Sequence, residues 1–139
     1  MSRSLFTSRH GGFSRNEYES FNLAKHVGDD AGVVESNREL LAKELGIDRS
    51  NLFFINQVHG SRVVEIDESS SYLQELDADA LFTRRSGVAL AVLTADCIPL
   101  LLSSPSAIAA VHIGRKGLIA GVLEATLEKF ESYEIASNQ

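Results

Sequence analysis

Apolar stretches alternate with short polar segments along most of the chain, and two of these stretches have helical spacing. Residues 28–46 and 117–133 place apolar side chains three or four positions apart, which is typical of an amphipathic helix. The apolar positions are Val33, Val34, Leu40, Leu41 and Leu45 in the first, and Ile119, Val122, Leu123, Leu127 and Phe130 in the second. Asp29 or Asp30 is expected to cap the start of the first helix, and Gly46 to end it.

The remaining apolar stretches have the length and the turn-forming flanks of strands. We predict strands at residues 51–58, 61–67, 77–83, 87–94, 98–104 and 107–113. The first two are expected to pair around His59-Gly60. The stretch at 87–94 is apolar on both faces, which predicts a central strand. Residues 7–23 show little periodicity and predict a structured loop or a broken strand. Several strands with two flanking helices indicate an α/β or α+β sandwich.

Composition narrows the class of protein. The chain has 139 residues, 44% of them hydrophobic, which fits one globular domain over residues 1–139. The formal net charge is −6. A negative field repels polyanions, so we expect no nucleic-acid partner and no acidic membrane surface, although a local arginine can still hold one small anion.

Cysteine content and hydropathy suggest a compartment. The single cysteine cannot form an internal disulfide, and no apolar run approaches membrane-spanning length. The N-terminus lacks a charged segment followed by an apolar one, as a secretory signal would have. These features predict a soluble cytoplasmic protein with a reduced thiol.

Polar residues interrupt the apolar pattern at three places. His59 lies in NQVHGSR, Cys97 breaks the run LTADCIPLLL, and His112 stands near the end of a predicted strand. Each alone is more often structural: a histidine at a strand end, or a small buried thiol. Together they form either a zinc shell of two imidazoles and one thiolate with an open fourth position, or a Cys-His nucleophile pair. The spacing of the three residues does not decide between the zinc shell and the nucleophile pair.

Two further polar residues have alternative interpretations. Asp96 precedes the cysteine and either orients one of the histidines or caps the following turn. Arg38 lies within a predicted helix, in ESNRELL, where a solvated helix face is the ordinary interpretation. The chain contains no Walker motif, no dinucleotide fingerprint and no nucleophile elbow.

The order of these motifs resembles one family. TSRHGGFSRNEYESFNLAKHVGDD, VESNR, NQVHG, DADALFT, GVALAVLTADCIPLLL and AAVHIGRKGLIAGVLEATL follow one another from Thr7 to about Phe130. In this order they resemble the YfiH family, also called the laccase-domain or multicopper polyphenol oxidase family. The resemblance implies an α+β fold with an α/β/β/α layered sandwich.

The resemblance also implies an activity. Family members look like zinc-dependent purine nucleoside phosphorylases that act on adenosine, inosine, guanosine and methylthioadenosine and also deaminate adenosine. The family's zinc ligands fall here on His59, Cys97 and His112, and its phosphate-contacting arginine falls on Arg38. Asp96 is assigned only a supporting role, in which its carboxylate orients one of those ligands. Copper, from the older oxidase label, is the less favoured metal.

This sequence departs from the family pattern in two ways. The family's VHAGW motif reads VHIGR here, so Ile113 stands beside a proposed ligand and Arg115 replaces a tryptophan. We expect Arg115 to disfavour a metal dication or to attract phosphate. Segments that follow the last helix in the family are not found, so we expect an incomplete sandwich and a homo-oligomer that covers its open surface. The alternatives are a catalytically impaired binding or structural protein and a metal-free cysteine hydrolase.

Overall fold

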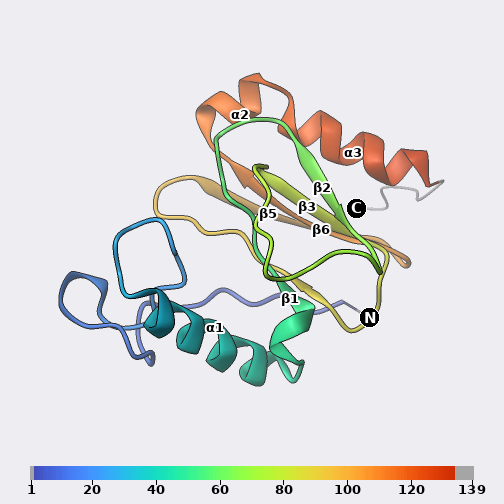
Figure 1. The fold of residues 1–139 in the computed structure, drawn as a ribbon. Helices are drawn as coiled ribbons and strands as arrows, with labels where there is room; N and C mark the ends of the chain where they lie inside the picture. The colour runs from blue at the N-terminus through green and yellow to red at the C-terminus, as the bar shows by residue number, and fades with distance from the viewer. Residues whose placement is uncertain (1, 134–139) are drawn as a thin grey trace.

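A sheet of four strands forms the centre of the computed structural model, which describes residues 2–133 (Figure 1). In spatial order its strands are β2 (Val63–Ile66), β3 (Ala80–Thr83), β6 (Ile108–Ile113) and β5 (Ile98–Ser103). β2 and β3 are parallel, and the other two pairs are antiparallel. This order leaves β5 at one edge of the sheet.

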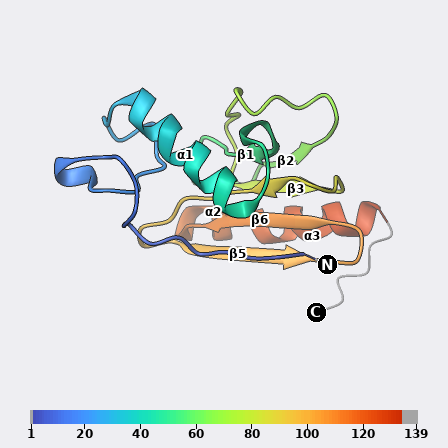
Figure 2. The ribbon, with the colours of Figure 1, turned by 90° about the horizontal axis from the view of Figure 1, so that it is seen from below.

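Two short strands form a second, parallel sheet. They are β1 (Leu52–Phe53) and β4 (Ala89–Leu90). Figure 1 shows β1 between the larger sheet and α1 (Ala31–Leu45), and Figure 2 gives the view from the side of α1. One apolar cluster joins the small sheet to α1, a second joins it to the larger sheet, and two more join the larger sheet to α3 (Val122–Ser132). Helices and a mixed sheet confirm the predicted α+β class, and the packing order follows the expected α/β/β/α layers.

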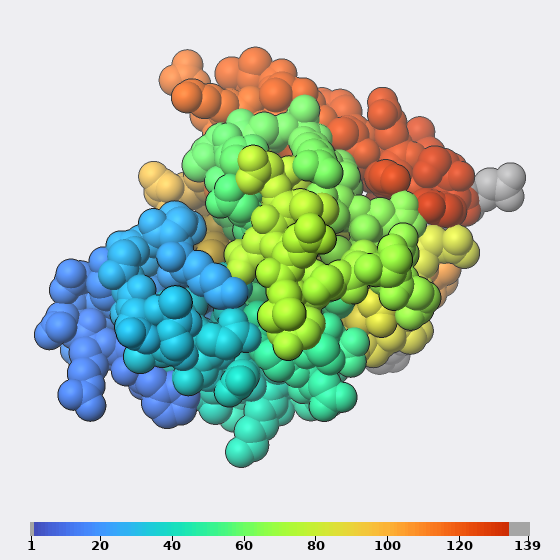
Figure 3. Space-filling model, viewed as in Figure 1, coloured from blue at the N-terminus to red at the C-terminus, as the bar shows by residue number. Residues whose placement is uncertain are grey.

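The first predicted helix is confirmed with its termini. The side chain of Asp30 accepts a hydrogen bond from the Val33 N–H at 3.0 Å, which satisfies one free donor of the first turn. Gly46 ends α1 in the left-handed conformation with φ 73°, where a side chain would be strained. Two short 3-10 helices, Asn16–Tyr18 and Arg49–Asn51, precede and follow this helix. Figure 3 shows the N-terminal segment and α1 on one side of the molecule, away from α3.

The second predicted helix is divided in two. α2 (Arg115–Ile119) ends where Gly121 adopts φ 89°, and α3 begins at the next residue. Val122 and Phe130 face the core as expected, but Ile119 is 78% exposed, so its predicted place on the buried side is wrong. The break turns α2 away from the direction of α3. None of the helices within residues 2–133 is long and apolar enough to cross a bilayer.

The predicted pairing of residues 51–58 with 61–67 is wrong. β1 pairs with β4, and β2 pairs with β3. The reason lies in the turn itself, because the backbone N–H groups of Val58, His59 and Gly60 all donate to the carboxylate of Asp79. These donors are therefore bound to a side chain in place of a hairpin partner.

The predicted central strand at 87–94 is also wrong in its extent, because only β4 has a strand partner. Beyond β4, the side chain of Gln57 binds both backbone groups of Leu93, each at 2.7 Å, and so takes the position of a strand partner. The apolar character on both faces is explained by two cores. Alternate residues pack into different clusters: Val88, Leu90 and Val92 into one, and Ala89, Ala91 and Leu93 into the other.

Candidate metal centre

Three side chains that are far apart in sequence meet at one end of the larger sheet. His59 comes from the turn that follows β1, Cys97 immediately precedes β5, and His112 lies in β6. Their ligand atoms all lie within 4.8 Å of one another. The Cys97 Sγ is 3.9 Å from His59 Nε2, and the two imidazole rings meet edge to face with centroids 4.8 Å apart. The structure thus brings together the three residues singled out from the sequence.

Strand register accounts for two of these positions. β5 and β6 pair with Ile98 opposite Ile113 and Pro99 opposite His112, so Cys97 lies at the end of the same ladder. His112 is 3% exposed, whereas His59 is exposed. The group therefore has one face anchored in the core and one face open to ligands.

Asp79 holds the two histidines, and the sequence interpretation missed it. Its Oδ1 is 2.8 Å from His112 Nδ1 and accepts the His59 backbone N–H at 2.9 Å. Its Oδ2 accepts the N–H groups of Val58 and Gly60 at 3.2 Å and 2.6 Å. The residue is fully buried, directly before β3. The available signal was a carboxylate between two alanines, Ala78 and Ala80, directly before the apolar residues of a predicted strand.

Two glycines leave space for this arrangement. A Cβ on Gly114 would lie 2.7 Å from Cδ2 of His59 and 3.3 Å from Sγ of Cys97. A Cβ on Gly117 would lie 2.9 Å from the carbonyl oxygen of Gly60, so α2 can approach the histidine turn only because this position lacks a side chain. The glycines of IGRKG are therefore part of the geometry of the site.

The Cys97 thiol has an environment that opposes ionisation. Loss of solvation, the adjacent Asp96 carboxylate and the more distant Asp79 raise the pKa of Cys97 above its ordinary value of 9.0. Asp96 itself is exposed. Without a metal or another cation, the thiol stays protonated at neutral pH and is a weak nucleophile. This environment disfavours a metal-free cysteine nucleophile.

Arg38 lies in α1 and is 1% exposed, so its predicted solvated position on the helix face is wrong. Its guanidinium donates to the Leu23 carbonyl at 2.9 Å and to Glu75 at 2.6 Å, and it stacks on the Phe54 ring at 3.8 Å. These contacts give Arg38 a structural role between α1 and the loop around Glu75. Its role toward phosphate stays a prediction.

The departures from the family motif are accommodated. Ile113 is buried with Ala80, Val111 and Val122 in the core beneath α3, so its bulk does not face the three donor atoms. Arg115 is exposed at the first position of α2, immediately after Gly114. A cationic side chain therefore begins one residue from the closest approach to His59 and Cys97.

The donor set fits a zinc ion. Zinc prefers nitrogen and sulfur ligands with bonds of about 2.0 to 2.3 Å, so two donors of a tetrahedral shell lie roughly 3.5 Å apart. The observed separations, 3.9 Å for one pair and no more than 4.8 Å for any pair, require only a small contraction. Within residues 2–133, this is the one group of three or more histidine, cysteine or acidic side chains close enough to hold a metal.

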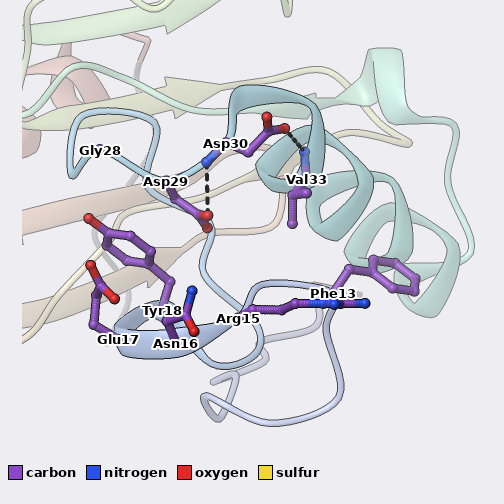
Figure 4. A pocket seen from close by; sticks show the side chains of 9 residues that line it. All are labelled: Phe13, Arg15, Asn16, Glu17, Tyr18, Gly28, Asp29, Asp30 and Val33. Carbon is purple, nitrogen blue, oxygen red and sulfur yellow. Dashed lines mark hydrogen bonds between the residues drawn. The ribbon is translucent and has the colours of Figure 1, made fainter.

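One hollow of the described surface lies away from the His-Cys-His group. It has a volume of about 340 Å³ and is formed by the N-terminal loop and the start of α1, with Phe13, Tyr18 and Asp29 among its lining residues (Figure 4). A second hollow, of about 480 Å³, adjoins the end of α1. Neither is lined by a residue of the His-Cys-His group.

This chain is similar to known proteins over most of its length. Residues 3–139 match the family model described as multi-copper polyphenol oxidoreductase laccase. A protein from Corynebacterium glutamicum named purine nucleoside phosphorylase is 47% identical over 93% of this chain and 54% of its own length. One of the same name from Streptomyces coelicolor is 48% identical over 88% of this chain and 51% of its own. The chain thus spans about half the length of these curated relatives.

A solved structure shows the same fold. The crystal structure of YfiH from Bacillus licheniformis, 29% identical, superposes with a TM-score of 0.84. The match covers 91% of this chain and 51% of that one.

Proposed function

Because the chain belongs to the multi-copper polyphenol oxidoreductase laccase family, we propose that it is a metal-dependent purine nucleoside phosphorylase. Family membership confirms the resemblance to YfiH proteins. The relatives' name supports a purine nucleoside and phosphate as substrates. The carrying observation is the convergence of His59, Cys97 and His112.

The proposed substrates are adenosine, inosine, guanosine and methylthioadenosine, with deamination of adenosine as a second activity. Phosphorolysis needs a phosphate oxygen placed against the sugar carbon that carries the base. Deamination needs an activated water at the purine ring. Both reactions use an open, polar centre that faces a ligand, and the exposed side of the His-Cys-His group offers one.

We propose zinc as the metal, held by His59, Cys97 and His112, with copper as the less favoured alternative. A bound dication with an open position supplies an acidified water and polarises an oxygen of the substrate. Asp79 keeps the Nδ1 proton of His112 directed toward itself, so Nε2 is the ring nitrogen that remains for the metal. One group of donors in residues 2–133 does not support a multicopper centre.

Asp96 and Arg115 are the charged residues we assign to the open side. Asp96 acts on the Cys97 thiol, which it adjoins, and favours the proton on sulfur until a metal displaces it. Arg115 is exposed beside Gly114, and its planar guanidinium matches two oxygens of a phosphate. Arg38 corresponds to the phosphate-contacting arginine of the family. A phosphate could reach its bound nitrogens only by displacing Glu75.

We also propose that this chain self-associates. Ile98 is 62% exposed next to Cys97, and Leu118 and Ile119 on α2 are 48% and 78% exposed. Three exposed apolar side chains thus stand on the segments that carry or follow the proposed ligands, one directly after Cys97 and two on α2. A second copy placed over them would bury apolar surface and give the nucleoside a wall.

Two alternatives remain proposals of lower rank. A catalytically impaired protein that acts by binding would keep the fold without turnover. A metal-free cysteine hydrolase would need a reactive thiol, and the raised pKa of Cys97 opposes this.

Metal content and turnover measured on the same samples test the proposal. We expect about one zinc per chain by mass spectrometry and adenosine cleavage that depends on added phosphate, both lost in Cys97→Ala. Zinc without turnover would favour the impaired binding protein. Neither zinc nor turnover in a folded wild-type chain would overturn the proposed function, and rapid alkylation of Cys97 in active, metal-free protein would favour the hydrolase.

A further inference from the structure

One buried carboxylate contacts two of the three proposed metal ligands. The Oδ1 atom of Asp79 accepts the backbone N–H of His59 at 2.9 Å and lies 2.8 Å from the ring nitrogen Nδ1 of His112. No part of Asp79 is exposed to solvent. A charge removed from water in this way is stable only when hydrogen bonds surround it. Here three backbone N–H groups donate to the carboxylate, and the His112 ring nitrogen lies within hydrogen-bond distance of it.

The backbone of Asp79 adds two fixed points. Its N–H donates to the Arg62 carbonyl at 3.1 Å, and its carbonyl accepts the N–H of His112 at 2.8 Å. Asp79 is therefore bound to the start of β2 on one side and to β6 on the other. The backbone that carries this carboxylate is therefore held by the sheet and not by the turn that the carboxylate contacts.

The turn that carries His59 depends on this carboxylate. His59 has φ 60°, in the left-handed region that residues other than glycine seldom occupy. Its N–H and those of Val58 and Gly60 all point to Asp79, which holds the turn in that conformation. In this conformation the His59 ring reaches to 3.9 Å from the Cys97 sulfur.

We infer that Asp79 is the positioning residue of the metal centre: it fixes the turn conformation of His59 and the tautomer of His112 at once. The inference rests on the proposed function for the identity of the centre. A carboxylate that accepts the Nδ1 proton leaves the Nε2 lone pair of His112 for a metal. It also gives a cationic centre with a single thiolate a second negative charge close by.

Asp79→Asn tests the inference with little change in size. The amide has one accepting oxygen and presents an NH₂ group where the carboxylate accepted hydrogen bonds. At least part of the groups that bind the Asp79 carboxylate therefore lose their acceptor. The matched control is Asp77→Asn in the same segment. Asp77 is exposed, and its side chain contacts only Asn56 in the described residues, at 2.6 Å.

The first readout is zinc affinity, measured for zinc alone by competition with a chromogenic chelator. Loss of such a supporting carboxylate typically weakens metal binding 10- to 100-fold. We expect a loss of about that size in Asp79→Asn and wild-type affinity in Asp77→Asn. Equal zinc affinity of the two folded variants would overturn the inference.

The second readout needs neither metal nor a variant. Nitrogen NMR of the metal-free wild-type chain distinguishes the two ring nitrogens of His112 and reports which of them carries the proton in the neutral ring. We expect Nδ1, and a proton on Nε2 would overturn the inference even where Asp79→Asn fails to fold. Because the NMR result does not depend on zinc, a wild-type chain that binds no zinc would defeat the proposed function and leave this test of Asp79 intact.

Discussion

Gly114 lies so close to the His59 imidazole that a Cβ at this position would sit 2.7 Å from the ring atom Cδ2. The backbone of Gly114 has φ −83°, which any residue adopts, so alanine there is disfavoured by contact alone. The closest atom belongs to an exposed side chain that can move. Relief of the contact therefore displaces the proposed ligand and leaves the core unchanged.

Gly114→Ala is expected to weaken zinc binding at least about tenfold while changing the free energy of unfolding by less than about 1 kcal/mol. Chelator competition and urea denaturation measure the two quantities. Gly60→Ala is the control, since its Cβ meets Asp79 and Val58 at ordinary distances of 3.6 and 3.7 Å and its N–H is kept. Unchanged zinc affinity in Gly114→Ala would show that the open space beside His59 is not used.

Glu75→Gln is expected to destabilise the fold in a pH-dependent way. Burial alone would raise the pKa of Glu75, but the hydrogen bond and charge of Arg38, and then Lys25, hold it below its ordinary value of 4.5. A lowered pKa in the folded state adds stability above the unfolded pKa, and this stability disappears as pH falls through the folded one. We expect about 2 kcal/mol of destabilisation at neutral pH, because Arg38 keeps a buried charge without its partner.

Urea denaturation of Glu75→Gln and wild type between neutral pH and about pH 3 measures this difference. The gap between the two proteins should narrow as the pH falls below about 4. Glu39→Gln, an exposed position on the same helix as Arg38, should show no such gap. A gap that stays constant down to the lowest pH would contradict the ion pair as its cause.

Arg115→Gln is expected to raise the KM for phosphate about tenfold or more, since a charge-assisted hydrogen bond contributes roughly 1.5 to 3 kcal/mol. Lys116→Gln removes the same charge from the neighbouring exposed position and serves as the control. Phosphorolysis rates measured at varied phosphate concentration give the KM for phosphate of each variant. If Arg38→Gln folds with unchanged stability and alone raises this KM, then Arg38 and not Arg115 binds phosphate.

Ile119→Asp is expected to convert an assembled protein to monomer, because it places a charge in the exposed apolar surface around the centre. Light scattering after size exclusion measures the mass directly. Leu73→Asp changes a side chain of similar exposure, 72%, in a distant loop and should leave the assembly intact. A wild-type chain that stays monomeric at high concentration would defeat the proposal of self-association.

Local signals in the sequence were sufficient to predict α1 and its two ends. Its cap, Asp30, and its terminating glycine act on backbone groups within a few residues of themselves, so their effect can be deduced without knowing the rest of the fold. The same holds for the extents of β5 and β6, which match the apolar stretches predicted as strands at 98–104 and 107–113. The three side chains singled out because they interrupt apolar stretches, His59, Cys97 and His112, do lie together in the structure. Their role as metal donors stays a prediction.

Pairing between distant segments could not be deduced in this way. The sequence shows apolar runs but not which group binds their backbone, and here Asp79 and Gln57 take places that a strand would have filled. Asp79 was missed because its chemistry appears only when three segments meet around it. The helix pattern alone did not predict the burial of Arg38, because the Leu23 carbonyl and Glu75, which bind its guanidinium, lie far away in the chain.

The amide of Gln57 has a consequence for how two distant loops keep their spacing. Gln57 stands two residues before His59, and Leu93, whose N–H and carbonyl it binds at 2.7 Å, stands four residues before Cys97. A single side chain thus sets the spacing between the segment that carries the His59 imidazole and the segment that carries the Cys97 thiol. An insertion or deletion in either short interval would leave the hydrogen bonds of the Gln57 amide in place and shift one donor along its loop. The lengths of the intervals 57–59 and 93–97 are therefore constrained as strictly as the residues they separate.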